Sequence, residues 1–374
     1  MFGSLRIAHG LLLAAFVSDP LLAQDDISKL LEKELQVNRL AGMAVVVRAD
    51  GAAVIGSAGV KRDGESAAIE RGNLFHLGSN TKAFTATMIA RLVETGKLSW
   101  ATTPLDVFPE LRATLHPALK DVTLEQLLSH HAGIAPYSDS SEKEYKALPP
   151  ISGSAVEQRI KFSAWVLQHK PALAPGKKGS YSNAGFVIAA AMAERVTGSS
   201  WEELVTAHVL EPLGIHAVYA WPATGDRGQP WGHSETKKGL KAQDPADELE
   251  QLPPFLLPAG GMAMSMGDYG KFLQEHLRGL EGKKSSFLSV ETIRKLHSSS
   301  MMDKYALGWG IAPVDGVPSS SHTGSAGSFY AVVVLQPGRD VAVAVVTNSD
   351  GVRSETSAKK VLKALLAQHL SPAR

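Results

Sequence analysis

The strongest constraint on the fold is the placement of strand-like segments at both ends of the chain. Residues 43–47 and 54–60 are apolar runs separated by an Asp-Gly pair, which is a β-hairpin signal. Residues 329–335 and 341–347 are rich in β-branched side chains and are separated by a Pro-Gly loop, which predicts a second hairpin. We therefore predict an α+β fold in which both ends of the chain supply strands to one antiparallel sheet.

Helical patterns surround and separate these strands. Residues 27–37 and 352–370 are amphipathic and predict helices that flank the sheet. From about residue 80 to residue 280 the pattern is mostly helical, although residues 226–250 are polar and irregular and predict a surface segment. Capping boxes precede apolar runs at three places, which begin at Thr123, Ser154 and Ser200.

The expected domain spans residues 24–370. Its sheet subdomain comprises residues 24–78 and 301–370, and a helical subdomain of residues 79–300 is inserted between them. We find no internal repeat or heptad pattern.

Residues 1–23 have the layout of a signal peptide. Arg6 precedes an apolar core that is too short to cross a bilayer, and Ala23 precedes the favoured cleavage point. We therefore expect an exported protein, periplasmic or secreted, without stable membrane insertion once the signal is removed. An uncleaved membrane tether is the alternative.

Composition excludes several classes of protein. The chain has 374 residues, 44% of them hydrophobic and 20% charged, which is typical of globular proteins. Its net charge of +1 gives no excess of positive charge of the kind that binds nucleic acid. It contains no cysteine, which excludes disulfides, a thiolate nucleophile and cysteine-ligated zinc. There is also no His-Glu-x-x-His motif, so we expect neither a metal nor another cofactor.

Ser79 and Lys82 form the leading candidate for chemistry. They lie three residues apart where a short apolar segment ends and an amphipathic helix begins, so their side chains share one helix face. A serine hydroxyl becomes a strong nucleophile when an adjacent base takes its proton, and a desolvated lysine can be that base. The Ser-x-x-Lys pattern also occurs in three charged stretches, where we expect solvated surface: at Ser140, Ser234 and Ser357.

Two further segments fit an acyl-transfer site. Tyr181 and Asn183 open a predicted helix, where the tyrosine can relay a proton and the asparagine can fix a carbonyl or hold the lysine. The second segment precedes the strand at residue 329, and its glycine permits close approach of the backbone. It consists of His322, Thr323, Gly324 and Ser325. Each segment also has an ordinary structural interpretation, as a helix N-cap region or a strand entry.

The order of these three motifs resembles the serine hydrolases related to class C β-lactamases and D-alanyl-D-alanine carboxypeptidases. The likeness covers the chain from about residue 27 to about residue 370. It extends to four flanking segments: residues 122–130 (VTLEQLLSH), 211–215 (EPLGI), 259–262 (AGGM) and 306–310 (ALGWG). The resemblance implies a β-lactamase/transpeptidase-like fold with the active site between the sheet and the helical part.

The resemblance also implies a role for each motif residue. Ser79 would be the acylated nucleophile, with Lys82 and Tyr181 sharing the proton transfers. Asn183 would position the substrate amide, and the backbone N–H groups of Ser79 and Ser325 would form the oxyanion hole. His322, Thr323 and Gly324 would lie on the strand that binds the substrate.

The resemblance leaves the substrate open. True β-lactamases usually carry lysine where this chain has His322, and an imidazole near its ordinary pKa is mostly neutral at pH 7. We therefore expect hydrolysis of small esters, amides or D-amino-acid peptides through an acyl-enzyme, with a small molecule or short peptide as the only partner. A class C-like β-lactamase and a slowly acylating penicillin-binding sensor are the alternatives. We expect His322 to gain charge as the pH falls toward 6.

Overall fold

The computed structural model describes residues 24–49, 51–247, 251–298 and 304–368. The predicted signal segment, Asp50 of the first hairpin turn and the last residues of the predicted domain lie outside these ranges. Within them, no helix is both long and apolar enough to cross a membrane.

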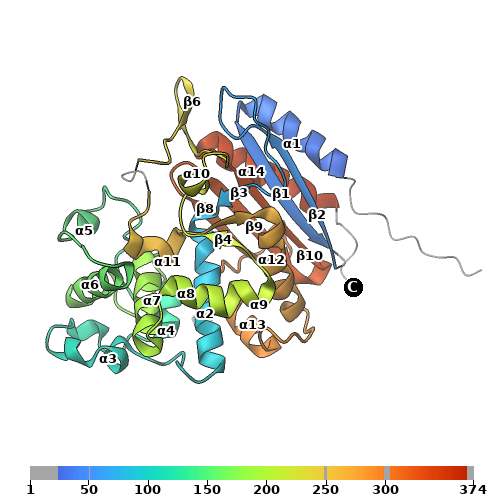
Figure 1. The fold of residues 1–374 in the computed structure, drawn as a ribbon. Coiled ribbons are helices and arrows are strands. Elements are labelled where there is room, and N and C mark those ends of the chain that lie inside the picture. Colours follow the sequence, from blue (N-terminus) through green and yellow to red (C-terminus); the bar gives the residue numbers. More distant parts are fainter. Residues whose placement is uncertain (1–23, 50, 248–250, 299–303, 369–374) are drawn as a thin grey trace, which may run out of the picture.

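The main sheet has five antiparallel strands in the order β2-β1-β10-β9-β8. Figure 1 shows the blue strands of the N-terminal end beside the red and orange strands of the C-terminal end. The central contact pairs β1 with β10, and Val45 lies opposite Val345. The predicted sheet built from both chain ends is therefore confirmed. Its strands are β1 Gly42–Ala49, β2 Ala52–Gly59, β8 Ser320–Ser325, β9 Tyr330–Gln336 and β10 Val341–Thr347.

Helices cover both faces of this sheet because its central strands are apolar on both sides. Val45 packs in a core with the terminal helices α1 (Gln24–Asn38) and α14 (Val352–Gln368). Val46, on the opposite face, packs in the larger core with α12 (Met266–Leu280). A Cβ on Gly270 of α12 would lie 2.9 Å from Val46, so the helix and the strand approach closely there. Although α12 falls within the predicted helical subdomain, it packs on the sheet.

The remaining helices form the inserted part, and α3 to α7 lie on the left of Figure 1. All three predicted capping boxes are confirmed. Each capping serine or threonine side chain accepts the backbone N–H of the residue three positions on, and the side chain of that residue accepts the backbone N–H of the capping residue. The longer helices are α2 Thr81–Glu94, α6 Ala155–Gln168, α7 Asn183–Thr197 and α13 Val290–Leu296. The short ones are α3 Pro104–Val107, α4 Leu124–Leu128, α5 Lys143–Lys146, α8 Trp201–Val205, α9 Glu211–Leu213, α10 Pro222–Gly225 and α11 Leu257–Gly260.

Two small sheets were not predicted from the sequence. One is formed by β3 Leu74–His76, β4 Ala217–Val218 and β7 Ala263–Ser265, which are too short for a period-2 pattern. The other is a hairpin, β5 His233–Thr236 with β6 Gly239–Ala242, inside the segment predicted to be irregular. That prediction is wrong because a tertiary contact orders the segment: Glu235 donates its N–H to the carbonyl of Asp350.

Candidate active site

Ser79 lies in a single helical turn, η1 (Gly78–Asn80), between β3 and α2. Gly78 has φ of +51°, a conformation that favours glycine, and a Cβ there would lie 2.5 Å from the backbone nitrogen of Ser325. The turn therefore packs directly against β8. Lys82 follows one helical turn later in α2, as the spacing predicts.

Lys82 is completely buried, and its Nζ atom has three neighbours. It lies 3.1 Å from Ser79 Oγ, 2.7 Å from Asn183 Oδ1 and 2.7 Å from the carbonyl of Ala259. Burial lowers the pKa of Lys82 well below its ordinary value, because the charged form loses its hydration. A neutral amine has two N–H groups and one lone pair. The two N–H groups match the two carbonyl oxygens, which leaves the lone pair for the hydroxyl of Ser79.

Tyr181 is the second group at Ser79. Its hydroxyl donates to Ser79 Oγ over 2.7 Å. Although 38% of the tyrosine surface is exposed, the hydroxyl is enclosed in the site, and this burial raises the pKa of Tyr181 above its ordinary value. The phenol therefore stays protonated at neutral pH and presents its O–H to the serine.

Asn183 links the lysine to the loop after α4. Its Oδ1 accepts from Lys82, and its Nδ2 donates to the carbonyl of Tyr137 over 3.1 Å. The first residue of α7 is thereby held from two sides, since its own N–H donates to the carbonyl of Pro136. One N–H of the side-chain amide remains for a substrate carbonyl.

Strand β8 forms the opposite wall of the site. A Cβ on Gly324 would lie 2.0 Å from the carbonyl of Leu77, so only glycine fits there. The N–H of Ala326 donates to Phe329, and antiparallel pairs alternate, so Ser325 opposite Tyr330 has its N–H pointing away from β9. Ser79 and Ser325 thus lie on facing segments of the chain.

His322 is buried, and both of its ring nitrogens have partners within the protein. Nδ1 lies 2.6 Å from the carbonyl of Thr323, and Nε2 lies 2.8 Å from the hydroxyl of Tyr305. Burial first, and the nearby Lys82 second, lower the pKa of His322 to about 3. The prediction that this imidazole gains charge as the pH falls toward 6 is therefore wrong.

Two aromatic residues of the site were missed from the sequence, Tyr305 and His130. The His130 ring lies 4.5 Å from the Tyr181 ring and 4.4 Å from the Tyr305 ring, centroid to centroid. His130 has φ of +64°, and its Nδ1 accepts the N–H of Ser182, which fixes the ring under Tyr181. Their positions in the sequence could have indicated that they belong to the site, because His130 ends one family-like segment and Tyr305 directly precedes another.

The competing Ser-x-x-Lys matches lie elsewhere in the structure. Ser140 is in an exposed loop, and Ser234 lies on β5, where its hydroxyl donates to the carbonyl of Gly327. Ser357 is fully buried in α14, so the expectation of a solvated surface is wrong for that serine.

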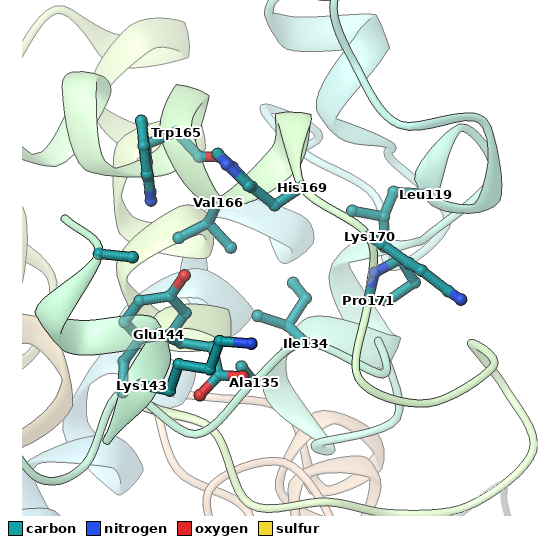
Figure 2. A pocket seen from close by; sticks show the side chains of 12 residues that line it. Leu119, Ile134, Ala135, Lys143, Glu144, Trp165, Val166, His169, Lys170 and Pro171 are labelled. Carbon is teal, nitrogen blue, oxygen red and sulfur yellow. The ribbon is translucent and has the colours of Figure 1, made fainter. Parts of the chain in front are cut away.

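A cavity of about 310 Å³ opens onto Ser79. Its described lining comprises Ser79, Ser138, Tyr181, Asn183, Leu252, Leu256, Ala259, Gly260, His322, Thr323 and Ser325, none of which carries a formal charge. A second cavity, of about 260 Å³, is shown in Figure 2; Ile134 and Ala135 line it, with Trp165 and Val166 of α6. Lysines also line the second cavity, but its described lining contains no serine.

Known structures share this fold. The octameric penicillin-binding protein homologue from Pyrococcus abyssi superimposes with a TM-score of 0.74 at 24% sequence identity, over 92% of this chain and 77% of that one. The crystal structure of SurE gives a TM-score of 0.72 at 24% identity, over 92% and 75% of the two chains. The architecture is therefore the fold of β-lactamases and penicillin-binding proteins.

The chain belongs to the Beta-lactamase family, whose model matches residues 27–368. Penicillin-binding protein 4 of Amycolatopsis lactamdurans is 26% identical, over 82% of this chain and 80% of that protein. The Unguisins hydrolase UngD of Aspergillus violaceofuscus is 25% identical, over 87% of this chain but only 61% of that hydrolase. A Beta-lactamase of Pseudomonas fluorescens is 24% identical, over 87% of this chain and 93% of that enzyme.

Proposed function

We propose that this protein is a serine hydrolase that forms an acyl-enzyme at Ser79 and acts on small esters, amides or D-amino-acid peptides. One observation carries the proposal: Ser79 Oγ contacts both Lys82 Nζ and the Tyr181 hydroxyl. Burial lowers the pKa of Lys82 well below its ordinary value and raises that of Tyr181, so each shift favours the uncharged form of the side chain. Two titratable groups held in complementary protonation states supply a base and an acid at neutral pH.

Acylation follows from these positions. As Ser79 Oγ attacks the substrate carbonyl carbon, its proton moves to the lone pair of Lys82. The N–H groups of Ser79 and Ser325 receive the developing oxyanion. Tyr181 then protonates the leaving group as its bond to the carbonyl carbon breaks. The resulting phenolate recovers a proton from the Lys82 ammonium, so the net transfer is from the serine to the leaving group.

Deacylation uses the same groups in the reverse sense. A water molecule takes the position of the leaving group and loses its proton to the Tyr181–Lys82 pair as it attacks the acyl carbon. The proton finally returns to Ser79 Oγ, which leaves with the electrons of the ester bond. The enzyme is thereby restored and the acid product is released.

The second candidate function is β-lactam hydrolysis or slow penicillin binding. It is supported by relatives named as a penicillin-binding protein and a Beta-lactamase. The described lining of the cavity carries no charge, which argues against an efficient β-lactamase, because penicillins carry a carboxylate that a cation usually binds. We therefore place this function second.

Export is part of the proposal and rests on residues 1–23. Expression of the full chain in a bacterial host should give a mature protein in the periplasm that begins at Gln24. A retained N-terminus in the membrane fraction would favour the tether instead.

A substrate panel tests the proposed function. A p-nitrophenyl ester, a D-alanyl p-nitroanilide and nitrocefin should be compared by kcat/KM with the wild type, Ser79→Ala and, as a matched control, Ser140→Ala. We expect hydrolysis of the first or second substrate to exceed that of nitrocefin and to disappear only in Ser79→Ala. Nitrocefin as the best substrate would favour the second candidate, and activity retained in Ser79→Ala would contradict both.

A further inference from the structure

The contacts of His322 determine its tautomer. The carbonyl of Thr323 can only accept a hydrogen bond, so the proton on the ring resides on Nδ1, 2.6 Å away. In a neutral imidazole the other nitrogen is then an acceptor, and the Tyr305 hydroxyl, 2.8 Å away, is its donor. Both nitrogens are thus committed to the protein, and the ring has no N–H left for a substrate.

The surroundings of the ring keep it in this state. Three titratable groups face the His322 ring: Tyr305 in the loop that precedes β8, Lys82 on α2, and His130 in the loop after α4. Tyr181 lies beside Tyr305. The two tyrosines are neutral when protonated, whereas Lys82 and His130 become cations. None of these states stabilises an imidazolium, so the neutral ring is favoured. No carboxylate of the described residues, which would favour imidazolium, is among them.

The other end of β8 also disfavours a substrate anion. The Ser325 hydroxyl donates to Oδ2 of Asp350, which places a carboxylate next to the cavity lining. The described lining itself contains no Arg or Lys, and burial lowers the pKa of Lys82 behind it well below its ordinary value. A negatively charged group beside β8 would therefore lack a cation and lie near an anion.

We propose that Tyr305 is a specificity-determining positioning residue: by donating to Nε2 it holds His322 as the Nδ1–H tautomer with no free N–H, and so selects acyl donors that carry no carboxylate beside β8. This inference rests on the proposed function and narrows its substrate class to uncharged esters and amides. Tyr305 acts through His322 and takes no part in the proton transfers at Ser79.

The first test is the ratio of kcat/KM for nitrocefin, which carries a carboxylate, to that for a neutral p-nitrophenyl ester. The ratio cancels the titrations of Lys82 and Tyr181, which affect both substrates. In the wild type it should stay constant between about pH 8 and pH 5.5. In Tyr305→Phe, which keeps the ring but frees Nε2, it should rise as the pH falls. In His322→Lys it should be raised about tenfold throughout, the difference between a charged and a neutral hydrogen bond.

Tyr330→Phe is the matched control. Its hydroxyl lies in the core on the far face of the sheet and has no hydrogen-bond partner among the described residues, so the ratio should match the wild type. A wild-type ratio that rises toward pH 6, or a ratio unchanged in His322→Lys, would overturn the proposal. A Tyr305→Phe profile identical to that of the wild type would remove the role of Tyr305.

The second test does not depend on turnover. Nitrogen NMR of protein labelled with ¹⁵N-histidine should show His322, assigned by loss of its signals in His322→Gln, as the neutral Nδ1–H tautomer down to about pH 5. Signals of a doubly protonated ring at pH 6, or of the Nε2–H tautomer, would overturn the proposal. If no substrate is hydrolysed, the proposed function fails, and this spectrum still decides the state of His322.

Discussion

Lys82 donates to Asn183 over 2.7 Å, a contact that joins α2 to α7 and connects residues 101 positions apart in the sequence. Burial lowers the pKa of Lys82, and the neutral oxygen of Asn183 adds no charge that would oppose this shift; a carboxylate at the same place would instead stabilise the ammonium. A neutral partner at this position is therefore one condition for Lys82 to act as a base.

The first prediction concerns that partner. Asn183→Asp keeps the size of the side chain but adds a negative charge beside Lys82, which should raise the pKa of the lysine. We expect kcat/KM for the best ester to fall at least about a hundredfold at pH 7, the loss typical for a base held in the wrong protonation state. The rate should recover as the pH rises. Asn183→Ala is the control, since it removes the contact without adding charge, and an Asp variant with an unchanged pH profile would exclude this role.

The second prediction concerns Tyr181. Tyr181→Phe removes the hydroxyl that donates to Ser79 and leaves the ring against His130. We expect turnover to fall by roughly two to four orders of magnitude, the usual effect of losing a general acid. Circular dichroism should show a normal fold. Turnover within a few-fold of the wild type would make Tyr181 a packing residue.

The third prediction concerns a buried histidine pair. His276 lies 2.8 Å from His297, which in turn lies 2.7 Å from the Ser320 hydroxyl on β8. Burial lowers the pKa of His276 to about 3 and that of His297 well below its ordinary value. The unfolded chain binds a proton at each site near pH 6.5, whereas the folded protein does not. The free energy of unfolding should therefore be highest above about pH 6.5 and should fall as the pH drops below it.

Each such histidine contributes a slope of up to about 1.4 kcal/mol per pH unit in that window. Urea unfolding between about pH 4.5 and pH 7.5 measures the slope, and the double variant His276→Gln, His297→Gln should have a smaller one. Equal slopes in the variant and the wild type would mean that the pair is charged in the folded state.

The fourth prediction concerns the ion pairs that join α6, α7 and α8. Arg159 is fully buried and lies 2.7 Å from both Glu194 and Glu202. Arg159→Ala leaves the buried Glu194 unpaired and should reduce the free energy of unfolding by about 3–5 kcal/mol. Arg195→Ala breaks an exposed pair with Glu110 and should cost at most about 1 kcal/mol. Equal losses in the two variants, measured by urea unfolding, would contradict this account.

The sequence predicted those parts of the fold that depend on local patterns. Both hairpins of the main sheet, the terminal helices and the capping boxes follow from neighbouring residues, because turn types and helix caps are short-range devices. The pairing of Ser79 with Lys82 is local in the same sense, since one helical turn brings them together. The family resemblance added the order of the three motifs.

The sequence could not predict the features that depend on packing between distant segments. Tyr305 and His322 carry no local signal for each other, and only the meeting of β8 with the preceding loop creates their hydrogen bond. The low pKa of His322 follows from burial, which the motif alone does not reveal. The β5–β6 hairpin is ordered by its contact with Asp350 and lacks an apolar pattern of its own.

The central claim is that Ser79 alone becomes covalently acylated, and one measurement tests it most directly. The protein should be treated with a fluorophosphonate probe, and the modified peptide identified by mass spectrometry in the wild type and in Ser79→Ala. We predict a single modification, on Ser79, in the wild type and none in the variant. Labelling of Ser140, Ser234 or Ser357 that persists in Ser79→Ala would contradict the account.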